Sequence, residues 1–288
     1  MLREFCGRVG LDPECTEALL SAVASLTPSL DAAVEQFLAN PEQSAAEAAA
    51  TVADPAEAAC ISPYTRDAAF ALLAFYREKE RYIAERGEEI FYASARDLVW
   101  KTRECYRRYG VHGTASLPWH GRILRREIVA LGRLQFHAVP FDLDGYEGGC
   151  LSLKRNDLVV KVHIPSSGRL TEEECLDAYR RAYRYFRPLF RTDILPITCI
   201  TWMLDPELLE EVPGGGLAAF ASHYHIFKTR EDPDNLNFWR IFGKNRDAFD
   251  VLPRETRLQA ALADRFARGG CMRIGYGIFA HDGEKIIK

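Results

Sequence analysis

The chain has 288 residues, of which 48% are hydrophobic and 27% are charged, and its formal net charge is −4. This length suits about two domains, and the composition is that of an ordinary globular protein. The acidic balance argues against non-specific nucleic-acid binding over the whole surface, and no run of about 18 apolar residues indicates a membrane span.

Eight cysteines are spread along the chain, and none of them forms a CxxC pair. This spacing is typical of reduced cytosolic thiols rather than of a disulfide framework or a zinc site. The first residues also lack the continuous apolar core of a signal peptide. We therefore expect a cytoplasmic protein without a metal site, and we expect neither a membrane nor a nucleic acid as its partner.

Residues 1–128 are expected to form a helical domain. A capping residue followed by proline is typical of a helix start, because the side-chain oxygen satisfies a free N–H of the first turn. The pair occurs at Asp12-Pro13, Thr27-Pro28, Asn40-Pro41, Asp54-Pro55 and Ser62-Pro63. The apolar periodicity predicts longer helices near residues 64–86 and 88–109, and a shorter one near 119–131.

Near residue 130 the hydrophobic period changes from 3.6 to 2. Leu134, Phe136 and Ala138 alternate with polar residues, and Val160, Val162 and Ile164 alternate with Lys161 and His163. These two stretches are expected to form an antiparallel pair with one apolar and one polar face. Further strands are predicted at residues 197–204, 223–228 and 271–280, with a helix at 254–268. The fold class is therefore α+β, with a mixed sheet flanked by helices in a second domain of residues 129–288.

The best-defined feature is a strand, a polar loop at residues 165–170 and a capped helix. Thr171 and Glu174 have the spacing of a capping box, so a helix is expected to start there. A helix N-terminus offers free N–H donors and a partial positive charge, which favour an anion such as phosphate. The loop has neither the GxxxxGK[ST] nor the GxGxxG pattern, so a P-loop and a dinucleotide fingerprint are not supported.

Three segments resemble marker segments of a bacterial family that joins an N-terminal helical domain to a C-terminal domain similar to GNAT-type N-acyltransferases. They are residues 132–136 (GRLQF), residues 162–165 (VHIP) with Gly168 and Leu170, and residues 202–206 (WMLDP). Phe242-Gly243, Leu252-Pro253 and Gly275-Tyr276-Gly277 also fit that pattern.

The resemblance implies an acyl-CoA co-substrate, with acetyl-CoA or a longer acyl group. The strand before the central helix would bind the pantetheine arm, and the loop with the helix start would bind the pyrophosphate. The next parallel strand would splay away and open the acyl site. The residues implied to bind the cofactor are Val162, His163, Ile164, Ser166, Ser167, Gly168, Arg169 and Thr171.

This sequence departs from the family pattern at two points. The usual pyrophosphate loop reads (Q/R)xxGx(G/A), whereas residues 166–169 read SSGR and lack the second glycine. His137 stands where an acidic residue is expected. Both departures bear on the affinity for the cofactor and on the chemistry of the site.

Acyl transfer to an amine requires a base to accept a proton and an acid to protonate the thiolate leaving group. A histidine with a pKa near 6.5 suits the base at neutral pH, so His163 and His137 on the polar strand face are candidates. Tyr224 is a candidate acid on the predicted strand at 223–228. We expect an acyl-CoA-dependent N-acyltransferase that acts on a small amine by direct transfer; the alternative is a catalytically idle ligand-binding or regulatory protein with the same fold.

Three further features carry weaker hypotheses. His223 and His225 would point the same way on a strand and begin a metal site, but no third ligand is identifiable. Cys199 is a possible nucleophile, although a cysteine within a strand is more often a small buried hydrophobe. A basic cluster near the domain junction would attract an anion or a nucleic acid. Its members are Lys101, Arg103, Arg107, Arg108, Arg122, Arg125 and Arg126.

Overall fold

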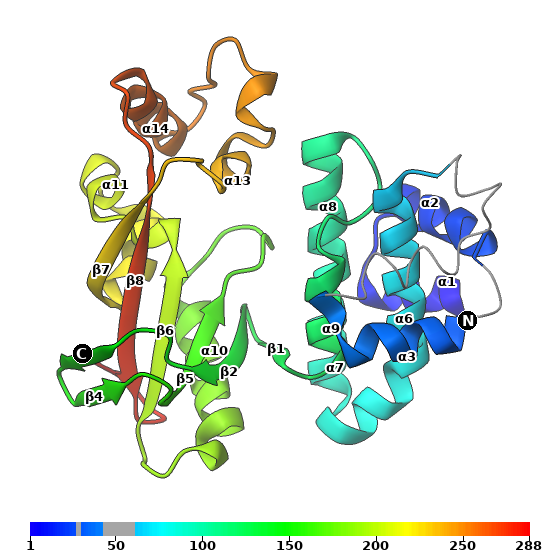
Figure 1. The fold of residues 1–288 in the computed structure, drawn as a ribbon, viewed down its shortest axis with the longest axis horizontal. Coiled ribbons are helices and arrows are strands. Elements are labelled where there is room, and N and C mark those ends of the chain that lie inside the picture. The colour runs from blue at the N-terminus through cyan, green and yellow to red at the C-terminus, as the bar shows by residue number, and fades with distance from the viewer. Residues whose placement is uncertain (27–29, 43–60) are drawn as a thin grey trace. The chain divides into compact units, whose positions relative to one another are not determined.

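The computed structural model describes residues 1–26, 30–42 and 61–288. The chain separates into two compact units, residues 1–130 and residues 131–288. The first unit is helical, and the second is a sheet with helices (Figure 1). This is the α+β architecture that the sequence predicts. Within the described ranges, no helix is both long and apolar enough to cross a membrane.

The helices of the first unit pack around one long central helix, α6, which contacts α2, α7, α8 and α9. Phe70, Phe75 and Tyr82 of α6 are fully buried, so its apolar residues form the centre of the core. The helices are α1 (Leu2–Val9), α2 (Pro13–Ala24), α3 (Leu30–Ala39), α6 (Pro63–Arg86), α7 (Glu88–Ala95), α8 (Asp97–Tyr109) and α9 (Leu117–Leu124).

The helix starts at Pro13 and Pro63 are confirmed, but the predicted reason for them is wrong. Neither Asp12 nor Ser62 caps its helix with a side-chain hydrogen bond. The carboxylate of Asp12 instead accepts two hydrogen bonds from the guanidinium of Arg103 on α8, at 2.7 and 2.9 Å. A charged partner in reach thus competes successfully with the free N–H groups of the first turn.

Other predictions for this unit need correction or fall outside the described residues. The single helix predicted for residues 88–109 is two helices, α7 and α8, which meet at Arg96. The helix predicted to reach residue 131 ends at Leu124. Pro41 and Glu42 are helical as expected. The pairs Thr27-Pro28 and Asp54-Pro55 include residues outside the described part of the chain.

The second unit is built on a mixed sheet in which β2, β5, β6, β8 and β7 lie side by side in that order, with β9 paired to β8. Only β5 and β6 run parallel; the neighbouring pairs are antiparallel. The strands of this sheet within the second unit are β2 (Leu134–Pro140), β5 (Leu158–His163), β6 (Leu195–Thr201), β7 (His225–Asp232), β8 (Met272–His281) and β9 (Ile286–Ile287). A further strand, β1 (Ile128–Leu131), begins in the last residues of the first unit. The antiparallel pairing predicted for β2 and β5 is confirmed.

Two strand regions were not predicted from the sequence. Residues 128–131 form strand β1 rather than the end of a helix. The glycine-rich connection between β2 and β5 contains a separate hairpin of β3 (Gly145–Gly148) and β4 (Leu151–Lys154). Each of these three strands has only four residues, which is too short for a reliable periodicity signal.

The connection from β5 to β6 contains the long helix α10 (Glu172–Phe186), which forms the predicted βαβ unit. Tyr179 of α10 is fully buried and its ring lies 4.9 Å from that of Phe279 on β8, so α10 covers one face of the sheet. The remaining helices are α11 (Pro206–Glu211), α12 (Gly215–Ser222), α13 (Phe238–Phe242) and α14 (Arg257–Ala267).

The segments WMLDP and GYG pack directly on one another. Residues 202–204 form a 3-10 turn whose Leu204 carbonyl lies against Gly275 of β8. A Cβ atom at Gly275 would lie 2.0 Å from that oxygen, so only glycine fits at this crossing. Asp205 then accepts hydrogen bonds from the N–H groups of Glu207 and Leu208, so its side chain caps the start of α11.

Candidate functional site

Strands β5 and β6 separate at one end. Their parallel register pairs Val160 with Ile197 and Lys161 with Thr198 and stops there, although β5 continues to His163 and β6 to Thr201. By contrast, β6 pairs with β8 over its whole length. This is the splayed pair that the family resemblance implies. Beyond these two pairs, the backbone groups of β5 do not pair with β6, so an extended ligand could form hydrogen bonds with them there.

The loop after β5 leads from this splay to the start of α10. Ser166, Gly168 and Arg169 are exposed, so the loop is accessible to a ligand. Gly168 has φ of +94°, a left-handed conformation that glycine adopts without strain. The predicted cofactor-binding residues therefore lie in one continuous path along the end of β5, this loop and the helix cap: Val162, His163, Ile164, Ser166, Ser167, Gly168, Arg169 and Thr171.

The start of α10 is capped by Thr171, whose hydroxyl accepts from the N–H of Glu174 at 3.3 Å. The same hydroxyl donates to the Glu174 carboxylate at 2.6 Å, so this carboxylate binds the Thr171 side chain, and of the predicted capping box the Thr171 half is confirmed. Three glutamates occupy the first turn, at residues 172–174. Their charge opposes anion binding, so attraction for a phosphate depends on the backbone N–H groups and on Arg169 of the loop.

Arg133, next to the start of β2, reaches across to this loop. Its guanidinium donates to the carbonyl oxygens of Pro165 at 3.1 Å and Gly168 at 2.9 Å. Its Nε lies 3.5 Å from the carbonyl oxygen of Arg169. The sequence pattern did not indicate this contact, because it joins residues more than thirty positions apart. The contact follows from the antiparallel pairing, which puts the start of β2 beside the end of β5.

The structure brings His137 and His163 together on one face of the sheet. Their strands pair Gln135 with His163 and His137 with Lys161, and the two imidazole rings lie 6.1 Å apart. Both histidines are half-buried and Gln135 is 3% exposed. The face predicted to be polar is therefore confirmed as polar, but it is partly covered.

Tyr224 lies on the opposite face. It precedes β7 instead of lying on a strand, because β7 starts at His225 and not at His223 as predicted. The Tyr224 ring lies 5.0 Å from the ring of Phe279 on β8. Phe279 pairs with Ile197 of β6, and Ile197 lies on the same face of the sheet as Cys199. Since alternate strand residues point to opposite faces, Cys199 and Val162 face α10 and Tyr224, whereas His163 faces away from them.

A chain of buried hydroxyl groups joins this face to the splay. The Tyr224 hydroxyl lies 3.2 Å from that of Tyr179, which lies 3.3 Å from Nδ1 of His223. The Tyr224 hydroxyl also hydrogen-bonds Cys199, whose thiol donates to the Val162 carbonyl oxygen at 3.8 Å. Burial raises the pKa of Tyr224 and of Tyr179 well above the usual value, so both hydroxyls remain protonated at neutral pH.

The structure contradicts two weaker hypotheses. Burial raises the pKa of the Cys199 thiol to about 12, so this cysteine is a buried apolar residue and not a nucleophile. His223 ends α12 and binds Tyr179, whereas His225 binds the Tyr146 hydroxyl at 2.7 Å. These two side chains therefore do not form the same-facing strand pair. The described residues contain no group of three or more His, Cys, Asp and Glu side chains able to hold a metal ion.

The basic cluster at the end of the first unit is largely neutralised. Ion pairs with nearby carboxylates engage Lys101, Arg103, Arg122, Arg125 and Arg126. Such pairs cancel most of the field that a nucleic acid would sense. The positive charge suggested by the sequence therefore does not form a continuous basic surface.

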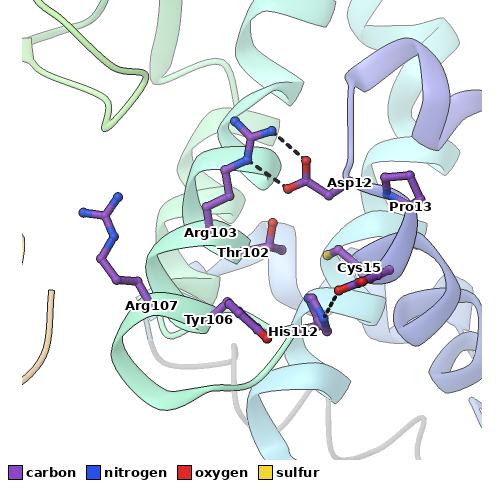
Figure 2. Close-up of a pocket in the computed structure, with 9 residues that line it drawn as sticks. Asp12, Pro13, Cys15, Thr102, Arg103, Tyr106, Arg107 and His112 are labelled. Carbon is purple, nitrogen blue, oxygen red and sulfur yellow. Dashed lines mark hydrogen bonds and ion pairs between the residues drawn. The ribbon is translucent and has the colours of Figure 1, made fainter.

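A cavity of about 770 Å³ lies within the first unit, between the start of α2 and α8. Figure 2 shows the Asp12–Arg103 pair on one side of it and His112 on another. Nε2 of His112 lies 4.0 Å from the carboxylate of Glu14. The His112 ring also stacks on Tyr106 at 4.6 Å. Sequence reasoning did not find this cavity, because its lining comes from segments about ninety residues apart. The lining residues are Asp12, Pro13, Glu14, Cys15, Thr102, Arg103, Tyr106, Arg107 and His112.

Comparison with protein families settles the relationship. Residues 128–279 match the GNAT-like C-terminal domain, and residues 1–126 match the N-acyltransferase N-terminal domain. The chain belongs to this family of GNAT-like acyltransferases. The resemblance noted in the sequence is thus confirmed, and the splay, the loop and α10 lie within the GNAT-like domain. A comparison with curated proteins gave no significant match.

Solved acyltransferase structures share the fold. A structure described as an acyltransferase with decanoyl-CoA and teicoplanin is 21% identical, with a TM-score of 0.73 over 96% of this chain and 86% of that one. A second, with CoA and 10C-teicoplanin, is 20% identical with a TM-score of 0.72 over the same shares. A mutant acyltransferase with octanoyl-CoA is 20% identical with a TM-score of 0.71, again over 96% and 86%. These similarities show that the N-terminal helical domain and the GNAT-like domain occur together in one known architecture.

Proposed function

We propose that this chain transfers an acyl group from acyl-CoA directly to a primary amine, with no covalent enzyme intermediate. The observation that carries this proposal is the opening between β5 and β6, which has His163 on one face of the sheet and Tyr224 on the other. A thioester held in such an opening is accessible to a base from one side and to an acid from the other. The family membership and the solved complexes support acyl-CoA as the donor.

The proposed reaction assigns a separate task to each group. The amine attacks the thioester carbonyl while His163, with His137 nearby, accepts a proton from the attacking nitrogen. Backbone N–H groups at the end of β5 polarise the carbonyl oxygen. The C–S bond then breaks, and the neutral Tyr224 hydroxyl donates its proton to the thiolate, so that the products are the amide and free CoA. His163 then releases its proton to solvent and Tyr224 regains one from solvent, which returns both groups to their starting states. The cofactor phosphates would lie at residues 166–171.

The donor and the acceptor are proposed more broadly than acetyl-CoA and one small amine. Two of the similar structures hold decanoyl-CoA or octanoyl-CoA, which supports a donor of medium chain length. One holds teicoplanin, which supports testing an amine carried on a larger molecule beside small amines. We also propose that the chain works in the cytoplasm, because the cysteines of its described part are free thiols.

The test combines binding with turnover. Thermal unfolding is measured with acetyl-, octanoyl- and decanoyl-CoA, with ATP as the control; a ligand at 100 times its dissociation constant adds about 2.7 kcal/mol to the free energy of unfolding. Amide products are then measured by mass spectrometry over a panel of amines that includes amino sugars and teicoplanin-type molecules. Product formation supports the proposal. Stabilisation by acyl-CoA without any product supports the alternative of an idle binding protein, and no stabilisation contradicts both.

A further inference from the structure

We propose that Arg133 is a positioning residue that shapes the phosphate-binding loop, so that loop N–H groups face the pyrophosphate of CoA. This inference rests on the proposed function and adds to it a residue outside the loop. Its basis is one guanidinium that binds the backbone carbonyl oxygens of Pro165, Gly168 and Arg169 in this loop.

The geometry follows from the sheet. β2 and β5 run antiparallel with Gln135 opposite His163, so Arg133, two residues earlier, lies next to the chain that leaves β5. From there its Nη1 and Nη2 reach the carbonyl oxygens of Pro165 and Gly168 at 3.1 and 2.9 Å. Arg133 is half-buried, and burial lowers the pKa of its guanidinium. These hydrogen bonds therefore replace hydration that the side chain has partly lost.

The direction of the N–H groups follows from the planarity of the peptide bond. In a trans peptide the C=O and the next N–H point in opposite directions, and the described chain contains no cis peptide bond. Carbonyl groups that point at Arg133 therefore turn the N–H groups of Ser166 and Arg169 away from it. The third contact, at the carbonyl of Arg169, turns the N–H of Leu170 in the same way. The loop thus presents several donors to a common side, as an anion site requires.

This arrangement also accounts for the missing second glycine. Within the loop only Gly168 has a positive φ, so one glycine meets the conformational demand of the backbone. The rest of the shape is held by a side chain from outside the loop. Arginine suits this task because its planar fork offers several donors in fixed directions, whereas a lysine presents a single point charge.

The experiment compares two acyl donors that differ only in their phosphates. Initial rates are measured with octanoyl-CoA and with S-octanoyl-pantetheine, for the wild type, Arg133→Lys and Arg133→Ala. We expect KM for octanoyl-CoA to rise about tenfold or more in both variants, because several backbone donors to the phosphates lose their alignment. We expect kcat to change less than about threefold, and KM for S-octanoyl-pantetheine to change less than about twofold.

Arg265→Lys is the matched control. Arg265 is a buried arginine of the same unit that binds Asp205 and, at 2.8 Å, Glu211, away from the loop. Its replacement removes a comparable set of hydrogen bonds, so we expect a lower melting temperature with an unchanged ratio of the two KM values. A merely structural role of Arg133 would give this control pattern and would overturn the proposal.

Two outcomes separate this inference from the proposed function. If the wild type binds octanoyl-CoA but forms no product, the proposed function fails, and the Kd values of octanoyl-CoA and S-octanoyl-pantetheine, measured by calorimetry, still test Arg133. If the wild type turns over and both Arg133 variants lose affinity equally for the two donors, Arg133 does not position the phosphate loop. Unchanged affinity for octanoyl-CoA in both variants would also overturn the inference.

Discussion

The hydroxyl groups of Tyr179 and Tyr224 lie 3.2 Å apart in the core of the second unit, between α10 and the sheet. Both side chains are at least nine-tenths buried, at 0% and 5% exposed. Two neighbouring hydroxyls in an apolar setting each require a partner, and Nδ1 of His223 and the Cys199 thiol provide further ones. The arrangement fixes the direction of the Tyr224 hydroxyl beside the splay.

Replacing Tyr224 by phenylalanine tests it as the acid. We expect kcat to fall about a hundredfold, because the thiolate would leave without a proton donor. The free energy of unfolding should fall by only about 1 kcal/mol, the usual cost of one lost buried hydrogen bond. Tyr179→Phe is the control, because it removes a hydroxyl from the same chain without removing the proposed donor. Equal kcat values for the wild type and Tyr224→Phe would exclude this role.

The pH profile gives a second test of Tyr224. An acid acts in its protonated form, so its contribution is lost as pH rises through its pKa. Burial raises the pKa of Tyr224 well above its ordinary value near 10. We therefore expect kcat in the wild type to show no fall on the basic side up to about pH 9.5, since the ordinary tyrosine pKa of about 10 is a lower bound. A fall centred near pH 8 would indicate a different acid.

The two histidines on the other face should contribute unequally. We expect His163→Gln to lower kcat about a hundredfold, because it removes the proposed base at the splayed end of β5. His137→Gln should have a smaller effect, because His137 pairs with Lys161, which lies further from the splay than His163 does. The His137 ring is 6.1 Å from the His163 ring. Steady-state rates at pH 7 and 9 measure both. A larger loss in His137→Gln would reverse the assignment.

His281 predicts how stability depends on pH. Burial lowers the pKa of this histidine from 6.5 to about 4, and its Nδ1 accepts from the N–H of Gly283 at 3.0 Å. The unfolded chain therefore binds more protons than the folded chain between about pH 4 and 6.5. The stabilisation is fully present above pH 6.5 and is lost as pH falls toward 4, by about 1–3 kcal/mol.

Urea unfolding from pH 4.5 to 7.5 measures this dependence. His281→Asn retains an acceptor for Gly283 but cannot be protonated, so the variant should show a smaller slope of stability against pH in this range. Its absolute stability is expected to be lower at pH 7, and this difference does not bear on the slope. An unchanged slope would mean that other groups cause the acid sensitivity.

Gly275 tests the packing between the 3-10 turn and β8. In Gly275→Ala the new methyl group would meet the Leu204 carbonyl oxygen at 2.0 Å, so strand and turn must move apart. We expect a loss of at least about 3 kcal/mol, at the upper end of the usual cost of overpacking. Gly7→Ala is the control, because its Cβ would meet nothing within 4 Å on helix α1. Thermal unfolding of the two variants should differ by many degrees.

Sequence patterns predicted the elements whose residues repeat with a clear period. The pairing of β2 with β5 and the start of α10 at Thr171 follow from alternation and from a capping pattern, and both are found. Short elements such as β1 and the β3–β4 hairpin were not predicted, because a strand of four residues shows too little periodicity. The break between α7 and α8 at Arg96 was not predicted, because buried residues continue at helical spacing on both sides of it.

The candidate site could be proposed along the chain but not across it. The residues from Val162 to Thr171 form one continuous segment, so the family resemblance was enough to propose them together. The contact of Arg133 with the loop joins residues more than thirty positions apart and depends on strand register. The division of His163 and Tyr224 between opposite faces depends on where β7 begins, two residues later than the pattern suggests.

The short pairing between β5 and β6 also has a mechanical consequence. Two rungs join the β2–β5 half of the sheet to the β6–β8–β7 half, whereas β6 and β8 share seven. Few hydrogen bonds therefore join the two halves of the sheet. A ligand that binds between β5 and β6 would cross-link these halves. In the proposed function the co-substrate would stabilise the sheet while it is bound, and the release of free CoA would remove that stabilisation.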